Sequence, residues 1–186
     1  MKLLVISGSR NPQGQTGRAV AALVEGAAAA RCSCETIFLP TLAIERCRQC
    51  DEDGWGVCRD GERCVIEDGL ADIVDKIRAA DVIVFATPVY FRDLSESLRG
   101  FLDRLRRVCV HGGKRDRIQG KTAVGICVAG GGGGGAPHCA FRLEEILATC
   151  GFDVVDMIPV RRQNLAVKCR TLRVVGEWLA TGPTSG

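Results

Sequence analysis

A loop near the start of the chain carries residue types that bind phosphate in proteins without help from a metal ion. It follows an apolar run at residues 2–7 and combines glycines with hydroxyl and amide side chains, namely Ser9, Asn11, Gly14, Gln15 and Thr16. A helical pattern starts directly behind it, so unpaired backbone N–H groups and the positive end of the helix dipole point at one spot. The Gly-Lys-Ser/Thr ending of a P-loop is absent, as is the Gly-x-Gly-x-x-Gly dinucleotide pattern. These residues alone predict either a phosphate site or an ordinary strand-to-helix loop.

Two further loops have unusual chemistry. The first holds Pro88, Val89, Tyr90 and Phe91, and Tyr90 is the single tyrosine of the chain. Proline fixes φ and lacks a donor, so the preceding strand must end there. The second is a run of six glycines at 130–135. Because glycine has no Cβ, this backbone can approach a flat ligand closely, and the alternative is a loop that binds nothing.

Four cysteines stand apart from the other seven. Cys47 and Cys50 are separated by two residues and Cys58 and Cys64 by five, so four thiols fall within an irregular stretch at 47–64. This spacing is typical of a metal site, although a redox-active pair of Cys47 and Cys50 and a stretch without metal remain open. The remaining cysteines lie in apolar or helical contexts, where a thiol acts as a small buried hydrophobe.

The elements that must position these residues alternate along the chain. Apolar runs predict strands, and helical periodicity predicts the segments between them. Strands are expected at about 2–7, 35–39, 81–86, 121–129 and 152–158, and helices at about 15–30, 69–79, 95–109, 137–150 and 170–180. This alternation predicts an α/β fold: a three-layer sandwich with a five-stranded parallel sheet in the order 2-1-3-4-5 and helices on both faces. In that order, ligands bind where the carboxyl ends of the first and third strands meet, which is where the unusual loops fall.

Composition limits the remaining possibilities. The chain has 186 residues, of which 46% are hydrophobic and 25% charged, and its net charge is +3. We therefore expect one globular domain over 1–186, with a cysteine-rich insertion at about 40–67. The sequence has no basic cluster interleaved with aromatic residues, which is the pattern that would predict nucleic-acid binding. No apolar run is long enough for a signal peptide or a membrane span, so we expect a cytoplasmic protein.

Taken together, the motifs resemble the flavodoxin-like NAD(P)H-dependent FMN reductases, and within them the iron–sulfur flavoprotein branch. The stretch 8–16 resembles the loop that binds the FMN phosphate in that family, and 87–91 resembles its Ser/Thr-Pro-Val-Tyr loop beside the flavin ring. The stretch 101–104, Phe-Leu-Asp-Arg, is similar to the Phe-x-Asp-Arg motif that follows. The glycine run is similar to the third flavin-contacting loop. The likeness spans nearly the whole chain.

The resemblance implies a set of site residues and partners. It implies FMN as cofactor and NAD(P)H as co-substrate, with a homodimer or homotetramer as the assembly. FMN would be bound by Ser9, Asn11, Gly14, Gln15, Thr16, Pro88, Val89, Tyr90, Phe91, Gly130, Gly131 and Gly132. Because the flavin supplies the chemistry, no protein acid or base is named as catalytic.

The cysteines depart from the branch's pattern at one point. That pattern is Cys-x2-Cys-x2-Cys-x5-Cys followed by acidic residues, and the first and last spacings match, as do Glu67 and Asp68. The middle spacing is seven residues, 51–57, where the branch has two. Cys47, Cys50, Cys58 and Cys64 are therefore candidate ligands of a [4Fe–4S] cluster, with zinc and a metal-free segment as the alternatives.

Two function classes follow. The first is an FMN-dependent oxidoreductase that takes hydride from NAD(P)H and reduces a small acceptor: a quinone, a nitro or azo compound, a flavin or a pathway metabolite. The alternative is a flavodoxin-like electron carrier with FMN, with or without a [4Fe–4S] cluster. Flavodoxin carriers are strongly acidic, which steers them to basic partners, so the mildly basic charge of this chain favours the enzyme.

Overall fold

The structure is a computed structural model that describes residues 1–61, 63–110 and 118–182. Its centre is a five-stranded sheet in the order β2-β1-β3-β4-β5, and every neighbouring pair is parallel. The strands are β1 (Lys2–Ser7), β2 (Ser33–Phe38), β3 (Val82–Pro88), β4 (Thr122–Ala129) and β5 (Asp153–Arg161). The predicted strand order and fold class are therefore confirmed.

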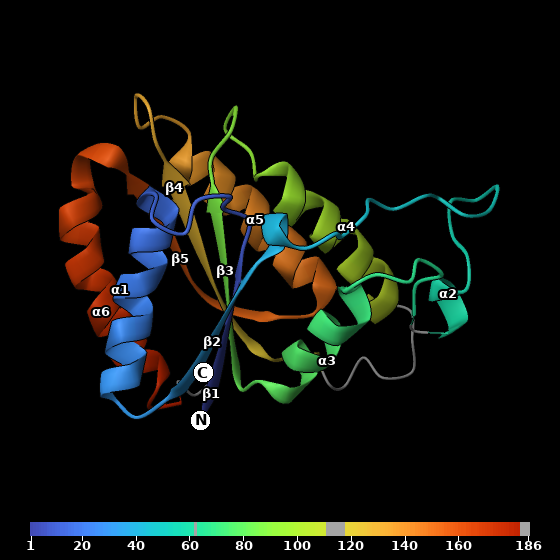
Figure 1. The fold of residues 1–186 in the computed structure, drawn as a ribbon, viewed down its shortest axis with the longest axis horizontal. Helices are drawn as coiled ribbons and strands as arrows, with labels where there is room; N and C mark the ends of the chain where they lie inside the picture. Colours follow the sequence, from blue (N-terminus) through green and yellow to red (C-terminus); the bar gives the residue numbers. More distant parts are fainter. Residues whose placement is uncertain (62, 111–117, 183–186) are drawn as a thin grey trace.

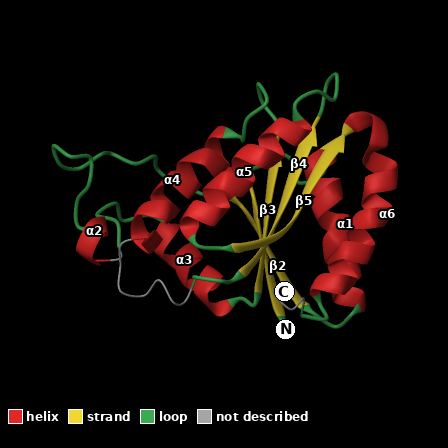
Figure 2. Cartoon of the chain, turned by 180° about the vertical axis from the view of Figure 1, so that it is seen from behind, coloured by secondary structure: helices red, strands yellow, loops and turns green. Residues whose placement is uncertain are grey.

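Helices cover both faces of the sheet and complete a three-layer sandwich (Figures 1 and 2). One face carries α1 (Gln15–Ala29) and α6 (Leu165–Leu179), and the other carries α3 (Leu70–Ala79), α4 (Glu96–Val110) and α5 (Ala136–Cys150). Shorter turns are η1 (Leu39–Thr41), α2 (Cys58–Gly61) and η3 (Arg162–Asn164). Within the described parts of the chain, no helix is long and apolar enough to cross a membrane.

Strand residues alternate between two separate hydrophobic cores. Leu4 and Ile6 of β1 pack toward α3, α4 and α5, whereas Leu3 and Val5 pack toward α1 and α6. All four are fully buried, because successive side chains of a strand point to opposite faces and both faces are covered. A continuous apolar run is the sequence signature of such a strand.

The helices α1 and α6 approach each other closely because two glycines face across their contact. A Cβ at Gly26 would stand 2.0 Å from the carbonyl oxygen of Arg173, and one at Gly176 would stand 2.0 Å from that of Leu23. Both neighbours are backbone atoms that cannot move aside without shifting a helix. The close approach fixes α1, whose first turn faces the candidate site.

Two predicted boundaries were wrong. The last strand continues to Arg161 rather than ending near 158, and the last helix begins at Leu165 rather than near 170. Edge strand β5 is only half-buried over most of its length, which weakens its apolar pattern, and Pro159 is tolerated at a sheet edge. The cysteine-rich stretch extends away from the sandwich beyond α4, and α2 was not predicted within it (Figure 1).

Candidate functional site

Three loops that follow β1, β3 and β4 meet at the carboxyl edge of the sheet and line one cavity of about 420 Å³. The sequence predicted all three loops. The predicted residues that line the cavity are Ser9, Asn11, Gly14, Gln15, Thr16, Pro88, Val89, Tyr90, Gly130 and Gly131. Three residues that were not named as FMN ligands also line it: Val128, Ala129 and Gly134, the last within the predicted glycine run. The predicted residues Phe91 and Gly132 do not.

The first loop is ordered by its own polar side chains. The backbone N–H of Asn11 donates to Ser9 Oγ at 3.3 Å, and the backbone N–H of Gln13 donates to the side-chain oxygen Oδ1 of Asn11 at 2.9 Å. Gly14 then serves as the N-cap of α1, and no side chain caps this helix end. The N–H groups of the first turn are therefore left for a ligand, and the helix dipole favours a negatively charged one.

Two features of α1 fit a bound polar ligand. The Gln15 Oε1 atom is buried and has no hydrogen-bond partner in the described structure. Buried polar atoms are nearly always paired, so this oxygen is suited to a donor that a ligand brings. A Cβ at Gly17 would stand only 1.8 Å from the carbonyl oxygen of Pro12, so glycine lets the loop lie directly on the helix.

The second loop is a tight turn that continues β3. The Val89 N–H donates to the Val128 carbonyl at 2.9 Å, and Tyr90 and Asp93 exchange backbone hydrogen bonds of 3.0 and 2.9 Å. The turn places Phe91 and Arg92 at φ values of 49° and 69°, a left-handed conformation that costs energy for residues with a side chain. It directs Phe91 outward, fully exposed, which explains its absence from the cavity lining.

The glycine run forms a defined turn. Gly131, Gly133 and Gly135 have φ values of 46°, 76° and 86°, which other residues rarely adopt. The Gly133 N–H donates to the Gly130 carbonyl at 2.7 Å, and the Gln163 side-chain amide donates to the Gly132 carbonyl at 2.9 Å. The carbonyl of Gly132 is therefore held by a side chain of η3 and does not line the cavity, whereas Gly134 does.

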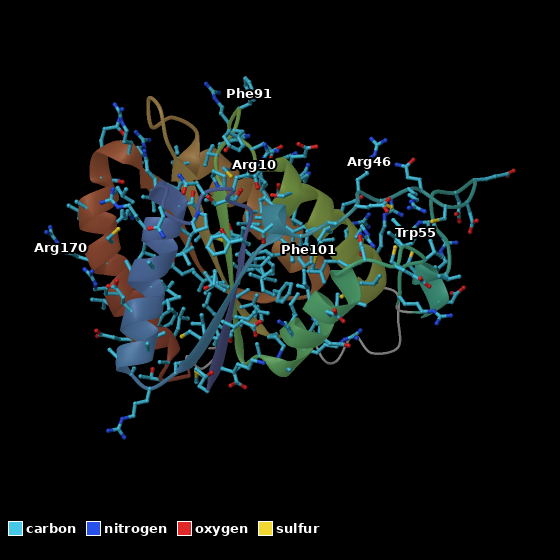
Figure 3. The ribbon with its side chains drawn as sticks, in the orientation of Figure 1. Arg10, Arg46, Trp55, Phe91, Phe101 and Arg170 are labelled. Carbon is cyan, nitrogen blue, oxygen red and sulfur yellow. The ribbon has the colours of Figure 1, made fainter. Side chains whose placement is uncertain are left out.

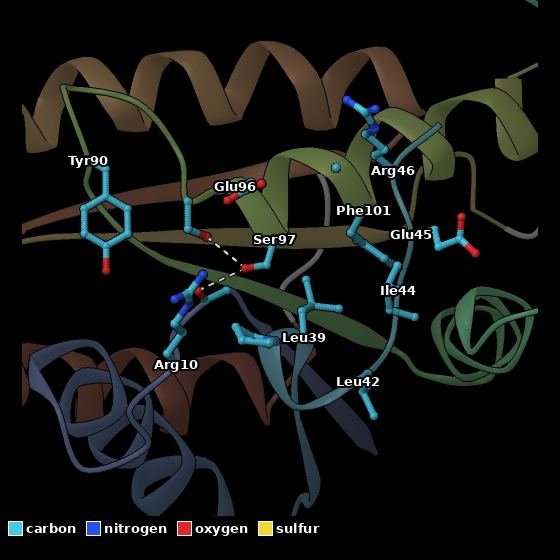
Figure 4. A pocket seen from close by; sticks show the side chains of 14 residues that line it. Arg10, Leu39, Leu42, Ile44, Glu45, Arg46, Tyr90, Glu96, Ser97 and Phe101 are labelled. Atoms are coloured by element: carbon cyan, nitrogen blue, oxygen red, sulfur yellow. Dashed lines mark hydrogen bonds between the residues drawn. The ribbon is translucent and has the colours of Figure 1, made fainter. Parts of the chain in front are cut away.

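A larger groove of about 570 Å³ begins at Tyr90, which lines both spaces (Figure 4). Its walls are η1, the segment after it and the first turns of α4. Ser97 Oγ donates to the Gly8 carbonyl at 3.2 Å and lies 3.3 Å from Ser95 Oγ, which ties α4 to the first loop. Arg10 and Arg46 bring positive charge to this groove, and Glu45 and Glu96 bring negative charge. Leu39, Ile44 and Phe101 supply its apolar surface.

The four predicted metal ligands come together but do not close a metal site. Cys47, Cys50, Cys58 and Cys64 all line one small cavity of about 20 Å³. Across residues 1–61, 63–110 and 118–182, no three His, Cys, Asp or Glu side chains are arranged to hold a metal ion. The thiol set suits iron or zinc, and holding a cluster would require this segment to rearrange around it.

A buried ion pair holds both ends of the cysteine segment on α4. Arg104 Nη1 donates to Asp68 Oδ2 at 2.6 Å and Nη2 to Oδ1 at 3.1 Å, and Nη1 also donates to the Glu45 carbonyl at 2.9 Å. The side chains of Arg104 and Asp68 are 1% and 6% exposed. Burial alone would raise the pKa of Asp68, but hydrogen bonds from Arg104 and from two backbone N–H groups hold this pKa below its usual value.

The middle of the segment is held one helical turn further along α4. Arg107 Nη1 donates to the Gly54 carbonyl at 2.6 Å. Its guanidinium lies 4.8 Å from the centroid of the Trp55 ring, and those of Arg59 and Arg106 lie 5.3 and 5.7 Å from it. Figure 3 shows Trp55 on the part of the chain that projects beyond α4. Cation–π contacts of this kind attach the segment to the helix. Sequence spacing gave no sign of the contacts with Arg106 and Arg107, because these residues lie far from Trp55 in the chain.

Comparison with known proteins agrees with this geometry. A family model described as NADPH-dependent FMN reductase matches residues 1–170. An iron-sulfur flavoprotein from Methanosarcina thermophila is 32% identical over 158 residues, which cover 83% of this chain and 77% of the relative. An iron-sulfur flavoprotein from Methanocaldococcus jannaschii is 31% identical over 131 residues, covering 70% of this chain and 65% of the relative.

Among solved structures, an NAD(P)H:quinone oxidoreductase from Methanothermobacter marburgensis superimposes with a TM-score of 0.73. At 19% identity, and with 100% of this chain and 99% of that chain covered, it shows the same fold. The family match extends over all three loops of the site. The chain therefore belongs to the NADPH-dependent FMN reductase family and is an FMN-dependent NAD(P)H oxidoreductase.

Proposed function

We propose that FMN binds in the three-loop cavity, with its phosphate at the N-terminus of α1 and its ring between the second and third loops. The observation that supports this most strongly is the convergence of ten predicted residues on one cavity of about 420 Å³. The N–H groups of the uncapped first turn of α1 would donate to the phosphate of FMN, and Gln15 Oε1 would accept a hydrogen bond from a hydroxyl or N–H group elsewhere on FMN.

Each wall of the cavity has a separate task in this proposal. The hydroxyl of Thr16 and the first N–H groups of α1 hold the phosphate. Ser9 Oγ donates to the Asn11 carbonyl at 3.2 Å, so its hydroxyl would turn toward the phosphate when FMN binds. The backbone at Val89 and the glycines at 130–131 lie against the ring, where no Cβ keeps the glycine backbone at a distance. Held by these loops, FMN would supply the redox chemistry, namely hydride transfer from NAD(P)H and two-electron reduction of an acceptor. Tyr90 marks the boundary between the cavity and the open groove, so acceptors enter along that groove.

The acceptor class we propose is a small planar oxidant such as a quinone, a nitro or azo compound, a flavin or a pathway metabolite. The groove beside Tyr90 has room for such a molecule, at about 570 Å³, and offers both apolar walls and arginines.

The test is anaerobic reduction of the FMN-loaded protein. Either NADPH or NADH alone should bleach the flavin band near ~450 nm. A quinone added afterwards should restore the band with one equivalent consumed. Protein that binds no FMN, or whose FMN is reduced only when a partner reductase is added, would contradict the enzyme proposal.

The second candidate, an electron carrier with FMN and a [4Fe–4S] cluster, is favoured by one observation: four thiols line a single cavity. Cys47, Cys50, Cys58 and Cys64 would hold the cluster, which would exchange single electrons with the flavin. Iron and sulfide assays on anaerobically purified protein test this. Four irons per chain, lost in Cys58→Ser but kept in Cys169→Ser, would support the cluster. Zinc, or no metal, would contradict it.

We also propose a homodimer or homotetramer in the cytoplasm. Phe91 is fully exposed and Tyr90 is 55% exposed at the rim of the cavity, so a neighbouring subunit would cover apolar surface beside the flavin. None of the eleven cysteines, all of which lie in the described parts of the chain, forms a disulfide, as expected in a reducing compartment. Light scattering tests the assembly: a monomer at micromolar concentration would contradict it, and Phe91→Ser should weaken a genuine dimer.

A further inference from the structure

A continuous path leads from the rim of the FMN cavity to the surface between α4 and α5. The groove that begins at Tyr90 continues into a second groove of about 530 Å³, and Arg46 and Gly100 line both. The walls of the far groove are residues spaced one helical turn apart on α4 and on α5. Arg99 belongs to the α4 wall and Arg142 to the α5 wall. Arg99 lies in the first turn of α4, only about 5 Å along the helix axis from its start.

The far groove carries uncompensated positive charge. Arg46, Arg99 and Arg142 take part in none of the ion pairs that join described residues. The acidic residues there do not cancel them, because Asp103 is already paired with Arg106 at 3.5 Å and Glu145 remains as one carboxylate against three arginines. Such a surface attracts an anion, and a planar guanidinium matches the geometry of a phosphate group.

The fold gives no reason for a glycine at position 100. A Cβ built there meets no atom within 4 Å, unlike those at Gly26 and Gly176, which are needed for helix packing. Glycine in a helix interior lowers helix stability relative to alanine. A bare stretch of backbone at the junction of two grooves instead leaves room for a molecule that lies across α4.

We propose that this path is the binding site of the hydride donor and that its arginines select NADPH over NADH. The inference rests on the proposed function, because the nicotinamide must reach the flavin beside Tyr90. The dinucleotide then crosses α4 over Gly100, and its 2′-phosphate lies between Arg46 and Arg99, with Arg142 on the opposite wall. NADH lacks that phosphate and so gains nothing from these arginines.

The first test uses the FMN-loaded protein and the fragment 2′,5′-ADP, with AMP as the probe that lacks a 2′-phosphate. Calorimetric titration should show 2′,5′-ADP binding at least tenfold more tightly than AMP. The double variant Arg46→Gln/Arg99→Gln should lose that preference, and its ratio of KM for NADPH to KM for NADH should rise at least tenfold. The matched control is Arg170→Gln, because Arg170 is an exposed arginine on α6 at the other side of the molecule (Figure 3).

A second variant keeps the test independent of stability. Gly100→Leu replaces glycine with a good helix former in open space, so the melting temperature should stay or rise. The new side chain should nevertheless raise the KM for NADPH at least fivefold. An unchanged KM ratio in the arginine variant, or an unchanged NADPH KM in Gly100→Leu, would overturn the inference while leaving the proposed function intact. Wild-type FMN that neither nucleotide reduces would instead overturn the proposed function.

Discussion

The substitution Asp68→Asn probes the buried ion pair that fastens the cysteine segment to α4. The Asp68 carboxylate accepts four hydrogen bonds: from Arg104 Nη1 at 2.6 Å, Arg104 Nη2 at 3.1 Å, the Glu45 N–H at 2.9 Å and the Leu70 N–H at 3.2 Å. Each carboxylate oxygen accepts one guanidinium and one backbone donor. Asparagine has a single acceptor oxygen, so its amide nitrogen must face one donor of each kind.

The cost follows from this count. A lost bond to a charged group is worth roughly 1.5–3 kcal/mol and a lost neutral bond roughly 1 kcal/mol, so Asp68→Asn should lower the free energy of unfolding by about 3 kcal/mol. That value agrees with the roughly 3–5 kcal/mol expected when one partner of a buried ion pair is removed. The control is the half-exposed Asp103, which lies 3.5 Å from Arg106 and 3.8 Å from Arg107. Because these contacts are long and partly solvated, Asp103→Asn should cost roughly 1 kcal/mol or less.

The assay is urea unfolding at pH 7, repeated toward pH 3. Because the pKa of Asp68 is lowered in the folded state, its stabilisation is present above its unfolded-state pKa and is lost as the pH falls through the folded-state value. The gap between wild type and Asp68→Asn should therefore be constant from about pH 5 to 8 and shrink below about pH 4. A cost under 1 kcal/mol at pH 7, or a gap that does not shrink in acid, would refute this reasoning.

Three further changes have defined outcomes. Gly176→Ala would place a Cβ 2.0 Å from a backbone oxygen of α1, so the free energy of unfolding should fall by at least about 2 kcal/mol; an unchanged urea midpoint would contradict the close helix contact. Arg107→Gln should cost about 1–2 kcal/mol and shift Trp55 emission to the red, because the ring loses the nearest of its three guanidinium neighbours. An unshifted spectrum would argue against this contact. Burial, with a smaller contribution from a neighbouring thiol, raises the pKa of Cys150 to about 12. Iodoacetamide at pH 8.5 should therefore label the exposed Cys50 and spare Cys150 until urea is added. Equal labelling rates of the two cysteines in the folded protein would count against this.

The sheet order and the three loops were predictable from the sequence because their signals are local. An apolar run followed by Pro88 or by the glycine run marks a strand end, and parallel strands bring such ends to one edge. Phe91 was assigned to the cavity because it follows Tyr90, but the left-handed turn that points it outward depends on backbone hydrogen bonds that sequence alone does not reveal.

The remaining parts of the site arise from contacts between distant segments. Arg46, Arg99 and Arg142 come from a loop and two different helices, so no spacing in the sequence groups them. Arg104 was noted within a family-like motif, but its role in holding Asp68 became visible only when α4 and the start of α3 were placed side by side. The four cysteines are close in sequence and line one cavity, but their spacing does not reveal how the thiols are arranged, and their role as metal ligands stays a prediction.

The central claim is that the N-terminus of α1 and its loop hold the phosphate of FMN, and comparing FMN with riboflavin tests it most directly. Fluorescence titration of the apoprotein should give an affinity for FMN at least ~100-fold above that for riboflavin, because several charge-assisted hydrogen bonds depend on the phosphate. Thr16→Val, which keeps the buried shape but removes the hydroxyl, should weaken FMN binding about tenfold and leave riboflavin binding unchanged. The control Thr171→Val, at an exposed threonine whose hydroxyl bonds only within α6, should leave both affinities unchanged. Equal affinities for FMN and riboflavin in the wild type, or no effect of Thr16→Val, would contradict the account.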